Sequence, residues 1–397
     1  MDAYASFRSR DYRFLLAGSF LSSFGLQMLS VAVSWDLYVA TKSAVALGNV
    51  GLVQVTPFLV FALFAGHFAD RHDRRIIMLV TQVMLLAACI FLAFNSSFVP
   101  IIYGCLFLTA TARTFQGPAR MAILPHVVPA DTLRNAITWN SSANEIASVS
   151  GPAMAGILLA SAGSRSVYIV QCCCATLTLY CFYRVRFRAE AGREISTPTG
   201  KSVLEGVRFV WTDKLILSAM SLDLFSVLFG GATALLPIYA VEILHTGARG
   251  LGWLRAAPSI GAVVMALTQT HFLRVRLAGR ALLWSVGGFG AAMVVFGLSR
   301  SLVLSFTMLV ITGALDNISV VLRNSLVQIA TPDRVRGRVL AVNNIFISCS
   351  NQLGAVESGW TAAWFGPIAS VVAGGMITMT IVATFAAKSR LLRQWRQ

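Results

Sequence analysis

Residues 66–75 read Gly66-His67-Phe68-Ala69-Asp70-Arg71-His72-Asp73-Arg74-Arg75, a run that holds five charged side chains. Apolar sequence precedes this run at 45–64 and follows it at 76–94. Each apolar stretch has about the 20 residues that a membrane-spanning helix needs. Because a charged turn cannot lie in hydrocarbon, the run marks a membrane boundary, and its positive charges place it on the cytoplasmic side.

The composition of the whole chain also indicates a membrane protein. Hydrophobic residues make up 56% of the 397 residues and charged residues 12%, with a mean hydropathy of +0.72. A soluble domain is about 25% charged. The N-terminus lacks the pattern of a cleaved signal peptide, so we expect the first span to be retained in the mature protein. The apolar segments are expected at 14–40, 45–65, 76–95, 98–119, 135–161, 166–183, 215–241, 250–273, 281–298, 302–322, 339–362 and 366–387.

Positive charge is distributed unevenly between the two sides of the expected membrane. With the N-terminus inside, most of the 32 Lys and Arg residues, Arg120 and Arg323 among them, fall on the cytoplasmic side. The outer side receives Lys42, Arg165, Arg249 and Arg300. This asymmetry follows the positive-inside rule and predicts contact with anionic membrane lipid. A nucleic-acid reader would instead carry its basic residues on one soluble element with stacking aromatics, so nucleic acid is not an expected partner despite the net charge of +16.

The two halves of the sequence resemble each other at a shift of about 201–204 residues. Tyr38 aligns with Tyr239, and Arg120 aligns with Arg323. Chance similarity between apolar segments is the alternative, but the nearly constant offset favours a duplication. We therefore predict an N-terminal six-helix half, a cytoplasmic linker and a C-terminal six-helix half at 1–185, 186–213 and 214–397.

The charged run resembles the signature loop of the major facilitator superfamily at Gly66, Asp70, Arg71, Arg74 and Arg75. In that family the loop joins the second and third helices, and here Asp73 stands where a glycine usually precedes the basic pair. The resemblance implies an all-α membrane protein of twelve transmembrane helices, in two six-helix halves related by pseudo-two-fold symmetry. It also implies that the loop gates transport, with Asp70 meeting the N-terminus of the eleventh span.

A second motif lies in the fourth apolar segment, where Arg113 is followed by Gln116 and Gly117. It resembles a family motif whose arginine is linked to proton transfer. An arginine about fifteen residues inside a span should face a cavity or an acid. Because arginine stays charged, it can favour the charged form of a neighbouring carboxylate. A fixed structural ion pair is the alternative.

A third motif consists of Gly151, Pro152 and Gly156 in the fifth segment. Small residues let two helices approach closely and proline bends a helix. The motif resembles one found in the exporter branch of the superfamily. Together with the stretch at 125–136, it makes the chain similar to a bacterial efflux group that includes the enterobactin exporter and macrolide efflux proteins.

Acids inside apolar spans are candidate proton sites, and each could equally belong to a buried structural pair. They are Asp36, Glu145, Asp223, Asp316 and Glu357. Asp316 is the repeat equivalent of Arg113 and lies at roughly the same depth when each helix rises about 1.5 Å per residue. We therefore predict one charged network of Arg113 and Asp316, with Asp223 as the alternative acid.

These observations predict a multi-pass protein of the bacterial inner membrane with both termini in the cytoplasm. We expect a monomeric, proton-driven exporter of a hydrophobic or amphiphilic small molecule, drug-like or siderophore-like, working by alternating access around a central site. A proton-coupled importer and a non-transporting sensor on the same fold are the alternatives. We expect neither an enzyme nor a cofactor, since the chain has no phosphate-cradling loop. No metal site is expected, because Cys and His show no ligand spacing.

Overall fold

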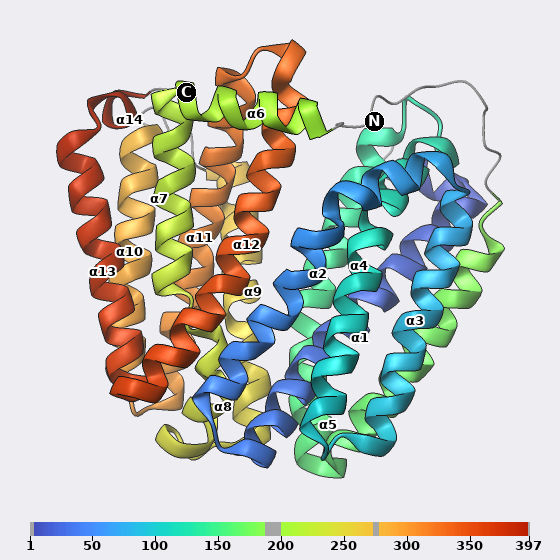
Figure 1. Ribbon diagram of the computed structural model, residues 1–397, viewed down its shortest axis with the longest axis horizontal. Helices are drawn as coiled ribbons and strands as arrows, with labels where there is room; N and C mark the ends of the chain where they lie inside the picture. The colour runs from blue at the N-terminus through green and yellow to red at the C-terminus, as the bar shows by residue number, and fades with distance from the viewer. Residues whose placement is uncertain (1–3, 187–199, 273–277, 396–397) are drawn as a thin grey trace. The chain divides into compact units, whose positions relative to one another are not determined.

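The computed structural model describes residues 4–186, 200–272 and 278–395, which are helical almost throughout and contain no β-strand (Figure 1). The elements in chain order are η1 (Ala5–Arg8), α1 (Arg10–Thr41), α2 (Ala44–Arg71), α3 (Arg74–Asn95), α4 (Val99–Val127), α5 (Leu133–Arg184), α6 (Gly200–Thr212), α7 (Lys214–Gly230), η2 (Ala232–Leu235), α8 (Leu236–Ile238), η3 (Tyr239–Ile243), α9 (Gly247–Phe272), α10 (Ala278–Leu298), α11 (Leu302–Ala330), α12 (Asp333–Phe365), α13 (Pro367–Lys388) and α14 (Arg390–Gln394).

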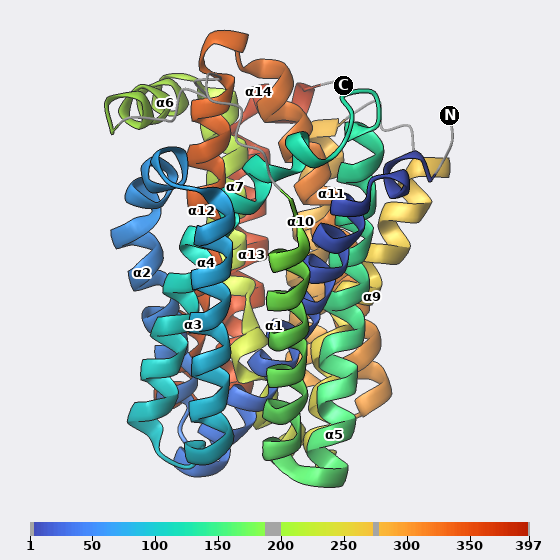
Figure 2. The same cartoon turned by 90° about the vertical axis from the view of Figure 1, so that its right-hand side faces the viewer.

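Ten helices of the described residues are long and apolar enough to cross a membrane. One of them, α5, has 52 residues. It would be about 78 Å long if straight, more than twice the thickness of a hydrocarbon core. It bends at Gly163, whose φ of 75° and ψ of 175° lie outside the helical region and suit glycine. The two arms of α5 meet at a sharp turn at the bottom of the view in Figure 2.

The linker expected at 186–213 contains the helix α6, which is too short to cross a membrane. Val210 of α6 is buried in the same apolar cluster as α7 and α12. Glu205 of α6 forms ion pairs with Arg338 and, at 3.6 Å, with Arg334, both on α12. Apolar packing and ion pairs therefore hold α6 against α12. Residues 187–199 of the expected linker lie outside the described residues.

The chain divides into two compact units. Unit 1 comprises Met1–Ala40 and Thr56–Thr199, and unit 2 comprises Thr41–Val55 and Gly200–Gln397. The division near residue 200 falls inside the expected linker, whereas the assignment of 41–55 to unit 2 was not predicted. This assignment arises because the start of α2 packs on α12. Gly48 of α2 approaches α12 so closely that a Cβ on Gly48 would lie 3.0 Å from the Cα of Gly359.

The surface of each unit is more apolar than the surface of a soluble protein and is suited to contact with lipid acyl chains. Large apolar side chains are well exposed on several helices, for example Phe94 at 70%, Trp284 at 80% and Val303 at 76%. Each unit also has an apolar core between its helices, with Tyr12 and Phe182 buried in unit 1 and Leu326 in unit 2. Exposed apolar surface of this extent on a soluble protein would cause aggregation, which supports insertion in a membrane.

Two pairs of residues with positive φ support an internal duplication. Lys42 (φ 50°) and His245 (φ 52°) are the non-glycine residues with positive φ in the described part of the chain. Gly163 (φ 75°) and Gly366 (φ 88°) are two of its three positive-φ glycines. Both pairs lie 203 residues apart (245 − 42 and 366 − 163), within the shift found in the sequence. The same unusual backbone conformation thus recurs at matching turns of the two sequence halves.

Several helices extend further than the expected apolar segments, α4 and α11 by the most at their C-terminal ends. α4 continues to Val127 and α11 to Ala330, past the expected ends at 119 and 322. As a result Arg323 lies within α11 and is 1% exposed. The prediction that Arg323 adds to the cytoplasmic surface charge is therefore wrong, because the helix does not end at the first charged residue.

Candidate functional site

The charged run of residues 66–75 forms the end of α2 and the start of α3. Asp73 is the N-cap of α3, since its Oδ1 accepts a hydrogen bond from the N–H of Arg75 at 2.8 Å. This explains locally why an acid can stand at the usual glycine position. Gly66 has open space where a Cβ would lie, and Arg71 ends α2 as an exposed residue. The side chain of Asp70 lies outside the described residues, so its contact with α12 stays a prediction.

The basic pair of the run connects α3 to two other helices of unit 1. Nη1 of Arg74 donates to the carbonyl oxygen of Ala122 on α4 at 3.3 Å. Nη2 of Arg75 donates to the carbonyl oxygen of Tyr183 at the end of α5, and its guanidinium lies 5.3 Å from the centre of the Tyr183 ring. Both arginines therefore bind backbone carbonyls, that of Tyr183 in the last turn of α5, where a cation is favoured, and that of Ala122 five residues before the end of α4.

The second motif places its residues on different faces of α4. Arg113 is exposed, whereas Gln116 is buried. Nε2 of Gln116 donates to Oε1 of Gln82 on α3 at 3.2 Å, and Nε2 of Gln82 donates to the carbonyl oxygen of Ala175 on α5 at 3.2 Å. The glutamine of the motif thus belongs to a buried chain of hydrogen bonds across three helices, which the sequence analysis missed.

The third motif lies where α5 crosses α1. Gly151, Pro152 and Gly156 are buried. A Cβ on Gly151 would lie 2.7 Å from Cβ of Gln27 and 2.9 Å from the carbonyl oxygen of Phe24. The two helices are therefore so close at this point that only glycine fits.

Two of the candidate acids lie in unit 1. Asp36 on α1 accepts a hydrogen bond from the hydroxyl group of Tyr168 at 2.8 Å, and Tyr168 is completely buried on the second arm of α5. Glu145 is half-buried on the first arm of α5. The Asp36–Tyr168 contact has the form of a structural link between α1 and α5, one of the two roles that the sequence left open for each acid.

The most deeply buried charges of the described residues lie in unit 2. Asp223 of α7 forms an ion pair with Arg323 of α11, and their side chains are 9% and 1% exposed. Asp223 lies nine residues from the start of α7, and Arg323 lies seven residues from the end of α11. At about 1.5 Å per residue, the two side chains are 10–14 Å inside these antiparallel helices, so the pair is within the expected span.

A small cavity adjoins this ion pair. Its volume is about 10 Å³, which is enough for one water molecule. Polar side chains line much of it: Asp223, Ser226, Ser285, Asp316 and Ser319. The hydroxyl groups of Ser226 and Ser285 donate to carbonyl oxygens of their own helices, whereas Oγ of Ser319 has no hydrogen-bond partner among the described residues. An internal water molecule would find suitable partners in this cavity.

The two acids of the cavity differ in their charge partners. Asp223 contacts a guanidinium, while Asp316 forms no ion pair with any residue that the structure describes. A charge without a partner is costly within a span, and binding a proton removes the charge of a carboxylate. Asp316 is therefore the acid of this cavity that has no ionic partner among the described residues, whereas Asp223 neutralises Arg323.

The network predicted for Arg113 and Asp316 joins residues of different units, so it stays a prediction. The alternative acid, Asp223, has Arg323 as its partner instead of Arg113. Sequence reasoning missed Arg323 because it took that residue for the end of a span. The available signal was Pro332, the next residue that can stop a helix after Arg323.

Comparisons with known proteins agree with this fold. The enterobactin exporter of Citrobacter koseri is 25% identical over 390 residues, which cover 97% of this chain and 93% of that protein. The enterobactin exporter of Escherichia coli is 24% identical over the same shares. A solved bacterial homologue of the human lysosomal transporter Spinster has a TM-score of 0.78 at 17% identity and covers 98% of both chains.

A nucleoside transporter of known structure, NupG, has a TM-score of 0.75 at 12% identity over 95% of this chain and 98% of its own. At such identities these structures show the fold alone. A model of the family described as "transmembrane secretion effector" matches residues 1–396. The chain is therefore a multi-pass membrane transporter of the major facilitator superfamily and belongs to its transmembrane secretion effector family.

Proposed function

We propose that this chain exports a hydrophobic or amphiphilic small molecule across the bacterial inner membrane in exchange for protons. The observation that carries the proposal is the position of Asp316, which lines a cavity of one-water size beside the Asp223–Arg323 pair. A proton on Asp316 would change the net charge of this cluster by one unit inside a span. A charge change of that kind can bias one conformation of a transporter over another.

The topology that fits this function has twelve membrane crossings. Ten helices qualify by length and hydropathy. The 52-residue α5 supplies two crossings instead of one because it turns at Gly163, and α4, with 29 residues, is long enough for another. An even number of crossings places both termini on one side, and the charged run at 66–75 makes that side the cytoplasm.

The gate and the coupling site have separate roles in this proposal. Asp70 acts as a cytoplasmic latch, and Asp316 carries the proton. Arg113 is an exposed arginine within a span, so we place it on the water-accessible substrate pathway, because an arginine facing lipid would be costly. Binding of substrate then favours release of the proton through the coupling between the two sites.

The substrate class is proposed from the relatives of this chain. Both relatives described above are enterobactin exporters, so a siderophore-like molecule is the first compound to test. A hydrophobic or amphiphilic drug-like molecule is the second.

Transport assays on purified full-length chain in proteoliposomes test the proposal. With an imposed proton gradient, enterobactin or a lipophilic dye should accumulate against its concentration gradient in the direction opposite to proton flow. Asp316→Asn should lose this uphill transport, while Asp36→Asn should retain it, because Asp36 hydrogen-bonds Tyr168 in unit 1. Accumulation in the same direction as proton flow would show an importer. Uphill transport driven by sodium alone would contradict proton coupling.

A further inference from the structure

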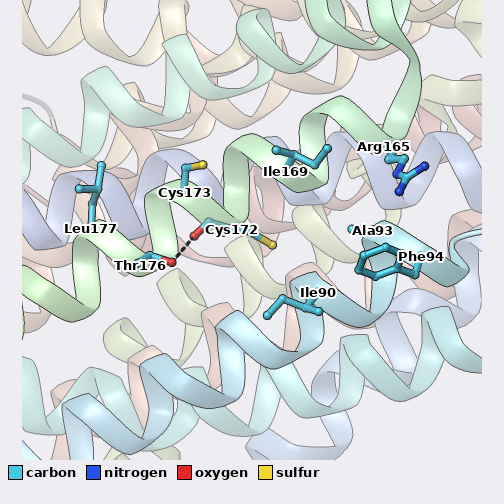
Figure 3. Close-up of a pocket in the computed structure, with 9 residues that line it drawn as sticks. All are labelled: Ile90, Ala93, Phe94, Arg165, Ile169, Cys172, Cys173, Thr176 and Leu177. Carbon is cyan, nitrogen blue, oxygen red and sulfur yellow. Dashed lines mark hydrogen bonds between the residues drawn. The ribbon is translucent and has the colours of Figure 1, made fainter.

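An apolar groove of about 510 Å³ lies between α3 and the second arm of α5, away from every residue used above for transport. Figure 3 shows the side chains that line it. They include Ile90, Phe94, Arg165, Ile169, Cys173 and Leu177. Four of these, Ile90, Phe94, Ile169 and Leu177, are between 45% and 70% exposed, so the groove is open along its length.

The wall of the groove offers almost no free hydrogen-bonding group. The hydroxyl group of Thr176, which also lines the groove, donates to the carbonyl oxygen of Cys172 at 2.8 Å (Figure 3). This internal bond satisfies the hydroxyl group and leaves a largely apolar side chain. The thiols of Cys172 and Cys173 behave as small apolar groups. A hydrocarbon chain therefore suits this groove better than a polar solute does.

One end of the groove carries a positive charge. The guanidinium of Arg165 lies 5.4 Å from the centre of the Phe94 ring, and Figure 3 shows both side chains at the same end, with Leu177 at the other. Arg165 is exposed and stands two residues after the turn at Gly163. Its fork of N–H donors matches the oxygens of a phosphate group.

The length of the groove matches one leaflet of a membrane. Arg165 and Leu177 are 12 residues apart on α5, which is about 18 Å along a helix. Half of a hydrocarbon core is about 15 Å. Phe94 is also 20 residues from Arg74 along α3, about 30 Å, so the arginine end of the groove is at the membrane surface opposite the charged run at 66–75.

We propose that the α3/α5 groove binds one anionic phospholipid of the outer leaflet, with an acyl chain against Ile90 and Ile169 and the phosphate group on Arg165. The apolar wall, the arginine at one end and the leaflet-sized length all select this occupant. The lipid proposal rests on the orientation of the chain in the membrane that the proposed function assumes. It does not depend on the coupling ion or on the transported substrate. It can therefore fail or hold whether or not proton antiport is confirmed.

Native mass spectrometry of the full chain in detergent tests the proposal. Phosphatidylglycerol and phosphatidylcholine with the same acyl chains are titrated separately, and the first bound lipid is quantified. We expect the anionic lipid to bind about tenfold more tightly, because phosphatidylcholine carries the same phosphate group together with a choline cation that Arg165 repels. Arg165→Gln should remove this preference. Arg300→Gln is the matched control, because it removes another exposed arginine of the expected outer side, and it should keep the preference.

A second variant separates the groove from a surface charge. Ile169→Trp fills the groove and should weaken the binding of both lipids at this site; Ile169 is 51% exposed, so a larger side chain leaves the core intact. Normal lipid binding by Ile169→Trp, or an unchanged preference in Arg165→Gln, would overturn the proposal. Displacement of the lipid by inorganic phosphate would also overturn it, by showing a site for the free anion.

Discussion

Replacing Asp223 by asparagine leaves the guanidinium of Arg323 without its carboxylate inside unit 2. The side chains are 9% and 1% exposed, so water and salt screen the pair very little. Nε of Arg323 has no hydrogen-bond partner among the described residues, so no second hydrogen bond of this nitrogen offsets the loss of the carboxylate. Removing one partner of a buried pair costs about 3–5 kcal/mol. We expect Asp223→Asn and Arg323→Gln each to lower the free energy of unfolding by about this amount.

The double variant Asp223→Asn/Arg323→Gln distinguishes this electrostatic cost from a loss of packing. Two neutral amides leave no unpaired charge, so the double variant should be more stable than either single variant, with a coupling energy of about 2 kcal/mol or more. Unfolding of the purified chain in detergent micelles, by heat and by denaturant, measures all four proteins. Arg300→Gln, an exposed arginine, should behave like the wild type. Single variants within about 0.5 kcal/mol of the wild type, or strictly additive effects, would refute the reasoning.

Three further predictions concern a single residue each. Asp316→Asn should abolish proton-driven uphill transport but keep substrate exchange without a gradient, because only proton binding is lost; vesicle assays measure both, and normal pumping contradicts it. Gly151→Ala should cost about 1–3 kcal/mol of stability, because the new Cβ would lie 2.9 Å from a backbone oxygen of α1. Gly117→Ala is its control, having nothing within 4 Å, and an equal loss of melting temperature in both would argue against the close contact. Asp73→Ala should cost about 1 kcal/mol by removing the N-cap of α3, whereas Asp73→Asn keeps an accepting oxygen and should show no such loss in the same melt.

The helical fold could be predicted from the sequence because hydrocarbon leaves the backbone few options. Every N–H and C=O group in a span must bond within the chain, so an apolar run of about 20 residues becomes a helix. The turns between runs were also readable where glycine or a charge interrupts the pattern. The break at Gly163 and its counterpart at Gly366 lie at the expected ends of the apolar segments, and both have the positive φ that glycine allows.

The pairing of charges could not be predicted, because hydropathy gives the depth of a residue but not the face of the helix it occupies. Asp223 lies in α7, within the apolar segment expected at 215–241, yet its partner depends on how α7 and α11 are rotated against each other. Arg323 was taken for the end of a span, since a charge lowers the local hydropathy. In fact α11 continues to Ala330, because a helix ends at a cap or a proline rather than at a buried charge.

The similarity between the two sequence halves, which predicts a duplication, allows the buried ion pair to be compared with the equivalent positions of the first half. At a shift of 203, Arg323 corresponds to Arg120, whereas Asp223 corresponds to Phe20, which stacks on Phe24 at 5.9 Å between ring centres. The first half of the sequence thus keeps the arginine and has an aromatic residue in place of the acid. Conversely, Asp70 has no acidic counterpart in the second copy of its loop, which reads Leu-Arg-Val-Arg-Leu-Ala-Gly-Arg at 273–280.

An acid retained in only one copy of a repeat is not needed for the shared helical fold, because the other copy forms the same helices without it. We infer that the two halves have divided the charged functions between them. The proposed gate acid Asp70 belongs to the first half, and the Asp223–Arg323 pair with the proposed proton carrier Asp316 belongs to the second. Adding a second acid to the first half, by Phe20→Asp at the repeat position of Asp223, should therefore not restore uphill transport to Asp316→Asn. Restored pumping in vesicles would show that the location of the charges is interchangeable and that this division is wrong.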